Sequence, residues 1–82
     1  MQELFELGAK ILSEQLNIEV DNITMETAFE DINADSIDVV EMIMAIEDVY
    51  DVEFPESDLE DYPTMGSLIE ALYTFLKREK NE

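Results

Sequence analysis

The sequence predicts an all-α fold with three longer helices, one short helix and a long loop between the first two helices. Three segments carry apolar residues at spacings of three, four and seven, which is the period of an amphipathic helix. No segment has the pattern of a strand, and no internal repeat is present. A chain of 82 residues suffices for one small domain, which we expect to span residues 1–82.

The first helix is predicted for residues 2–16. Leu4, Leu7 and Ile11 lie on one helical face. Asn17 follows the last apolar residue, and Asn is a common stop signal for helices. We therefore expect this helix to end at Leu16.

Residues 17–34 hold no sustained period and are predicted to form the long loop. Apolar residues such as Ile23 and Phe29 are scattered among turn formers, which predicts a loop attached to the core at several points. Loops of about 18 residues are uncommon in small domains and are usually functional.

The second helix, predicted for residues 36–51, has the clearest pattern. Pro55 then forces an extended segment, after which a new helical turn can begin. The residues assigned to the core face of this helix are Val39, Ile43, Ile46 and Tyr50, with Met42 and Val49 alongside them.

Residues 55–63 can hold only a short helical turn, with Leu59 and Tyr62 facing inward, and Pro63 ends it. Thr64 then caps the last helix, residues 65–80. The C-terminal end of that helix is basic, and the helix dipole favours positive charge at that end. The buried stripe of the last helix is expected to contain Leu68, Leu72, Phe75 and Leu76.

Ser36 lies among carboxylates where the second helix begins. Serine is common at N-caps, but Asp35 is an equally good N-cap and would place Asp38 at the third helical position, near the positive end of the dipole. In that second arrangement the Ser36 hydroxyl is surplus to the fold and projects from the helix end. Local chemistry supports the two assignments equally.

A second apolar stripe, consisting of Ile37, Val40 and Met44, runs along the same helix at spacings of three and four. One interpretation is that these residues cover other helices, above all Val40. The other is an apolar patch with an acidic rim, as in many protein interfaces. The flanking acids are Asp35, Asp38, Glu41, Glu47, Asp48 and Asp51.

The charge and the missing residue types exclude several functions. A net charge of −18 disfavours binding to nucleic acids and to anionic membranes. The same charge favours binding to basic protein partners or divalent cations. The chain has no His and no Cys, so it cannot form a catalytic triad, a zinc site or a disulfide. The acidic N-terminus lacks the signals of secretion, and we expect a cytoplasmic protein.

The residues around Ser36 almost form a calcium-binding EF-hand loop. Counted from Asp31, Asn33 and Asp35 occupy positions three and five, but Ser36 replaces the required Gly and Met42 the required Glu. We expect loose divalent binding and no dedicated metal site. An acidic interaction or calcium-binding helical module, in which Ser36 is only a cap, is the alternative from a different functional class.

The segment "DINADSIDVVEMIMAIED", residues 31–48, resembles the acyl carrier protein signature, in which D-L-G-A-D-S-L-D runs into a helix beginning V-E-L. The resemblance covers essentially the whole chain. It implies a right-handed four-helix bundle in which Ser36 is the attachment point for 4′-phosphopantetheine, moved there from coenzyme A by a carrier protein transferase. The thiol of the arm would hold acyl groups as thioesters, so the chain is expected to be a carrier in fatty acid biosynthesis and not an enzyme.

The resemblance further implies a monomer whose second helix meets basic surfaces of the transferase, acyl synthases, reductases and acyltransferases, with no nucleic acid and no membrane insertion. It also implies an acyl-chain cavity lined by residues such as Ile46, Leu59 and Ile69. The residues expected at the partner face are Asp35, Ile37, Asp38, Val40, Glu41, Met44, Glu47 and Asp48.

Two residues depart from the signature. Asn33 stands where Gly is usual, and Asn tolerates the left-handed conformation that the turn needs. Ile37 replaces the usual Leu, and its β-branch makes this partner-contact position stiffer. These departures leave an alternative function within the family, that of a specialised carrier for polyketide, other lipid or aminoacyl cargo.

Overall fold

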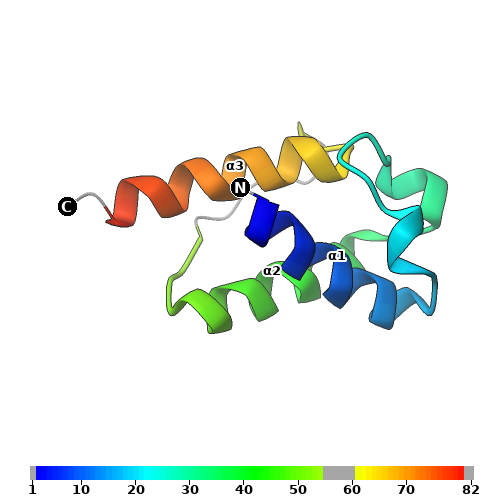
Figure 1. Cartoon of the computed structure of the whole chain (residues 1–82), viewed down its shortest axis with the longest axis horizontal. Coiled ribbons are helices and arrows are strands. Elements are labelled where there is room, and N and C mark those ends of the chain that lie inside the picture. Colours follow the sequence, from blue (N-terminus) through cyan, green and yellow to red (C-terminus); the bar gives the residue numbers. More distant parts are fainter. Residues whose placement is uncertain (1, 55–60, 81–82) are drawn as a thin grey trace.

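Three α-helices with apolar faces build the fold: α1 (Gln2–Leu16), α2 (Ser36–Tyr50) and α3 (Met65–Lys80). The structure, a computed structural model, describes residues 2–54 and 61–80. Figure 1 shows α3 along one side of the molecule, with α1 and α2 together on the other side. The all-α class and the three longer helices are therefore confirmed. The predicted short helix, together with Leu59, falls mainly outside the described residues.

Residues in the left-handed conformation end three helical segments. The φ angle is 58° for Asn17 and Asn33 and 55° for Asp51. Asn17 confirms the predicted stop after α1, and Asp51 ends α2 one residue earlier than predicted. Asn and Asp tolerate this conformation better than other side chains, because their short polar groups can hydrogen bond locally.

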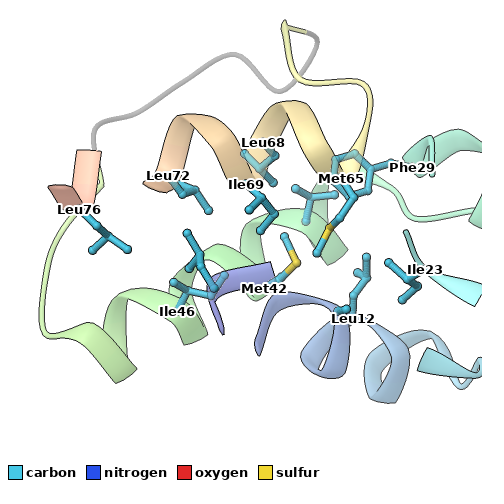
Figure 2. Packing of buried hydrophobic residues seen from close by; sticks show 13 residues of the cluster. Leu12, Ile23, Phe29, Met42, Ile46, Met65, Leu68, Ile69, Leu72 and Leu76 are labelled. Carbon is cyan, nitrogen blue, oxygen red and sulfur yellow. The ribbon is translucent and has the colours of Figure 1, made fainter. Parts of the chain in front are cut away.

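The core is one cluster of apolar side chains contributed by all three α-helices and the linker between α1 and α2 (Figure 2). Leu12, Met42 and Ile69 are completely buried, and Ile23 and Phe29 attach the linker to the core as predicted. The assignment of Val49 to the core was wrong, because its side chain is 62% exposed. Val49 is only about 20° around the helix from the fully buried Met42, so its exposure reflects its place in the last turn of α2, one residue before the helix ends.

The linker between α1 and α2 has more structure than the sequence predicted. It contains two 3₁₀ turns, η1 (Val20–Asn22) and η2 (Phe29–Ile32). An isolated antiparallel bridge joins Ala28 to Thr64, where the Phe29 N–H donates to the Pro63 carbonyl oxygen at 3.0 Å. Pairing of this kind satisfies backbone groups that would otherwise be buried without partners.

The start of α3 is held by two reciprocal hydrogen bonds. The Ser67 N–H donates to Thr64 Oγ1 at 3.2 Å, and the Thr64 N–H donates to Ser67 Oγ at 3.2 Å. The predicted cap at Thr64 is therefore confirmed. Tyr62, just before it, is half-buried and packs against the core as predicted.

Candidate functional site

Asp35 is the N-cap of α2, which decides between the two assignments that the sequence left open. Its backbone is extended, and its Oδ1 accepts a hydrogen bond from the Asp38 N–H at 3.1 Å. In return, Asp38 Oδ2 accepts from the Asp35 N–H at 3.3 Å. These two bonds form a capping box. Ser36 is the first helical residue, and the cap does not use its hydroxyl.

The environment of Ser36 differs from that of the other serines. Ser36 is exposed, and within residues 2–54 and 61–80 no group hydrogen bonds to its hydroxyl. Ser13 is only 7% exposed and its hydroxyl donates to the Lys10 carbonyl oxygen, while the Ser67 hydroxyl donates to the carbonyl oxygen of Thr64. Ser57 lies outside the described residues. Among the described serines, Ser36 is thus the one that is exposed and whose hydroxyl makes no hydrogen bond.

The turn before Ser36 is shaped by Asn33. This residue is left-handed (φ 58°, ψ 29°), and its N–H donates to the Glu30 carbonyl oxygen at 3.2 Å. The Ala34 N–H donates to the Phe29 carbonyl oxygen at 3.0 Å and closes η2. The conformation that glycine would adopt easily is therefore reached with Asn, as the sequence predicted. The turn ends directly before Asp35, the N-cap of α2.

The second apolar stripe of α2 is largely exposed on the surface. Ile37 is 65% exposed, Met44 59% and Val40 43%. Glu41 and Asp48 on the same helix are also exposed. The Ser36 hydroxyl therefore lies at one end of an apolar strip with acidic neighbours. Such a surface suits a partner that offers apolar contacts within a basic rim.

Comparisons with known proteins show the family to which the chain belongs. The family model described as "Phosphopantetheine attachment site" matches residues 9–72 of this chain. Acyl carrier proteins from Clostridium perfringens strains SM101 and 13 are each 40% identical to it over 68 residues, which cover 82% of this chain and 90% of the relative. The chain belongs to the acyl carrier protein family. As a member, it carries acyl groups on 4′-phosphopantetheine in fatty acid biosynthesis, as the sequence predicted.

Membership in the acyl carrier protein family also defines the kind of role that the chain has. It is a carrier rather than a catalyst, and it interacts with the enzymes of fatty acid synthesis. This sets aside the non-carrier acidic module. No helix in the described parts of the chain has both the length and the hydropathy that crossing a bilayer requires.

Glu47, a residue expected at the partner face, makes a contact inside this acyl carrier chain that the sequence did not reveal. Its Oε2 accepts a hydrogen bond from the Phe54 N–H at 2.7 Å, and the Glu47 side chain is half-buried. The Phe54 ring in turn packs edge-to-face on Phe75 of α3, with ring centroids 5.3 Å apart. Glu47 therefore anchors the segment that follows α2.

Replacing Glu47 with Ala is expected to lower the free energy of unfolding by about 1.5–3 kcal/mol, because a hydrogen bond to a charged group is lost. The matched control is Asp48→Ala, which removes the same charge from an exposed neighbour and should change stability by no more than about 0.5 kcal/mol. Urea denaturation measures both. Equal losses in the two variants would contradict an anchoring role for Glu47.

Two residues expected to line an acyl-chain cavity, Ile46 and Ile69, lie together in the core of this carrier. Both are completely buried, and in Figure 2 they project into the same core from α2 and α3. Met42 and Met65 are buried in the same cluster. Methionine is unbranched and flexible, so this part of the core can adapt its shape more easily than a core of β-branched residues.

Acidic side chains dominate the surface of the chain. Within residues 2–54 and 61–80, no group of three or more of them is arranged to hold a metal ion. We expect a few millimolar Mg²⁺ to raise the melting temperature, because diffuse divalent cations relieve the repulsion of an 82-residue chain with a net charge of −18. NaCl at matched ionic strength is the control. A melting temperature that does not respond to Mg²⁺ would contradict the expectation that repulsion among the acidic side chains destabilises the fold.

Proposed function

We propose that Ser36 is the residue that carries 4′-phosphopantetheine. The observation that carries this assignment is the exposed Ser36 hydroxyl at a helix start that Asp35 already caps. Ser36 Oγ forms a bond to the phosphorus of the phosphopantetheinyl group. The pyrophosphate P–O bond of coenzyme A breaks, and adenosine 3′,5′-bisphosphate leaves with the electron pair. The hydroxyl proton goes to a base on the transferase.

The residues of the chain then have distinct tasks. The attached arm supplies a thiol that holds acyl groups as thioesters, which this chain without Cys cannot supply itself. Asp35 and Asp38 hold the start of α2 rigid through their capping box, so the attachment point has a fixed position at the end of a helix. Asn33 sets the turn that leads to it.

The partner face that we propose runs along α2 from Ser36. Its apolar centre offers exposed surface for burial, and its acids speed the encounter with basic enzyme surfaces, an effect that salt weakens. The partners are the carrier protein transferase and the synthases, reductases and acyltransferases that handle the acyl group. The face consists of Asp35, Ile37, Asp38, Val40, Glu41, Met44, Glu47 and Asp48.

For the acyl chain, we propose a cavity between the helices at Ile46 and Ile69. Leu59, the third residue expected to line it, lies outside the described residues. The complete burial of Ile46 and Ile69 supports this cavity, because an acyl chain there is shielded from water. The chain acts as a single monomeric domain over residues 1–82. The absence of Cys, and hence of any need for an oxidising compartment, agrees with a cytoplasmic protein.

The test is the intact mass of the purified chain before and after incubation with coenzyme A and a phosphopantetheinyl transferase. We expect the gain of one phosphopantetheinyl group, which fragmentation places on the peptide holding Ser36 and not on those holding Ser13, Ser57 or Ser67. A chain with native circular dichroism that gains no mass, or gains it at another serine, would overturn the assignment.

A further inference from the structure

One side chain of α1 makes contact with two acids of the proposed partner face. Gln15 Nε2 donates a hydrogen bond to Asp38 Oδ1 at 3.1 Å and another to Glu41 Oε2 at 2.6 Å. The two bonds use both hydrogens of the amide nitrogen. Gln15 is half-buried where α1 packs against α2, so it reaches its partners across the contact between the two helices.

The neutrality of Gln15 is as important as its position. Asp38 and Glu41 are three residues apart on α2, a spacing at which like charges repel each other. The amide holds both carboxylates without cancelling their charges. Among the described residues, neither acid forms an ion pair. A cation in the same place would bind both acids and neutralise part of the charge that a basic partner needs.

We propose that Gln15 is a positioning residue of the partner face, which orders the carboxylates of Asp38 and Glu41 while leaving both charges available to a basic enzyme. The inference rests on the proposed function of that face. Side chains that are already ordered lose less conformational entropy when a partner binds, so the complex is tighter than with mobile acids. The partner recognised here is a protein surface that presents Lys or Arg side chains.

Three variants separate this role from a purely structural one. Gln15→Lys places a cation between the two acids, and Gln15→Met keeps the approximate size while removing both donors. The matched control is Gln2→Lys, which makes the same charge change on the same helix. Gln2 is exposed, and its amide bonds to Glu6 within α1 at 3.4 Å and not to an acid of α2.

The measurement is the steady-state kinetics of phosphopantetheine transfer from coenzyme A, with the carrier chain as the varied substrate. For Gln15→Lys we expect KM to rise roughly three- to tenfold over that of Gln2→Lys with kcat unchanged, because the encounter weakens while the chemistry at Ser36 does not change. Gln15→Met should give an intermediate KM. The melting temperature of Gln15→Lys should equal or exceed that of the wild type.

Equal KM values for Gln15→Lys and Gln2→Lys would overturn the inference, as would a loss confined to kcat. Gln15→Met keeps the test decisive if Gln15→Lys proves unstable, since an unchanged KM for Gln15→Met also overturns it. In these cases wild-type modification at Ser36 still stands, so the proposed function survives. A wild-type chain that is never modified would instead overturn the proposed function itself.

Discussion

Ser36→Ala is expected to abolish the transfer of 4′-phosphopantetheine while leaving the free energy of unfolding within about 0.5 kcal/mol of wild type. The modification is lost because the nucleophilic oxygen is removed. Stability is retained because the side chain is exposed and the capping box is built by Asp35 and Asp38. Intact mass after incubation with coenzyme A and transferase measures the attachment of 4′-phosphopantetheine. Urea denaturation measures the free energy of unfolding.

Asp35→Ala is the matched variant one residue earlier. It removes the oxygen that accepts the Asp38 N–H, which should lower the free energy of unfolding by about 0.5–2 kcal/mol. Because Asp35 also belongs to the proposed partner face, we expect slower modification than in the wild type, but the Ser36 hydroxyl is still present and the full gain in mass is still expected at the end of the reaction. The two variants therefore separate attachment from capping. If Ser36→Ala destabilised the chain as much as Asp35→Ala does, Ser36 would share the cap. If Ser36→Ala still gained the arm, another serine would be the attachment point.

Gly66→Ala should be strongly destabilising, by about 1–3 kcal/mol. A Cβ at this position would lie 2.5 Å from the carbonyl oxygen of Met25, the same oxygen that accepts the Gly66 N–H at 2.8 Å. That oxygen belongs to the backbone, so it cannot rotate away. The linker must shift away from α3, and the hydrogen bonds between the two segments weaken.

Gly8→Ala in α1 is the control for Gly66→Ala. A Cβ there would meet Met65 Cε at 3.0 Å, Ile69 Cδ1 at 3.3 Å and Met42 Sδ at 3.5 Å, which are ends of side chains that can adjust. Ala also favours the helix interior over Gly by about 0.8–1 kcal/mol, which offsets the crowding. We expect a change within about 1 kcal/mol in urea denaturation. A Gly66→Ala loss no larger than that of Gly8→Ala would contradict the close approach at Met25.

The sequence alone could predict the helices and single out Ser36 as the candidate attachment residue. The period of apolar residues in 2–16, 36–50 and 65–80 reflects contacts within one turn of helix, so it can be read without knowing the fold. The stops and caps at Asn17 and Thr64 depend on the same short range. The resemblance in the segment around Ser36 predicts this residue as the attachment point, and the matched family model covers that segment.

Other features depend on backbone conformation or on contacts that the residue types do not reveal. Whether Asp35 or Ser36 caps α2 could not be decided from residue types, because both are good caps and the backbone conformation selects between them. The bridge between Ala28 and Thr64 joins two segments that lack the alternating apolar and polar residues of a strand. The anchoring of Phe54 by Glu47 uses a residue whose charge alone suggested a solvent-facing role.

The sequence by itself thus determined the three longer helices, the core residues of most of α2 and the position of Ser36, because periodicity and capping act over a few residues. Only the tertiary structure decided which residues of other segments the acids of α2 touch. Gln15 reaches Asp38 and Glu41 across 23 and 26 residues of chain, and only the packing of α1 on α2 brings them together. The physical reason is range: helix formation is local, whereas these hydrogen bonds exist only once the hydrophobic core has placed the two helices side by side.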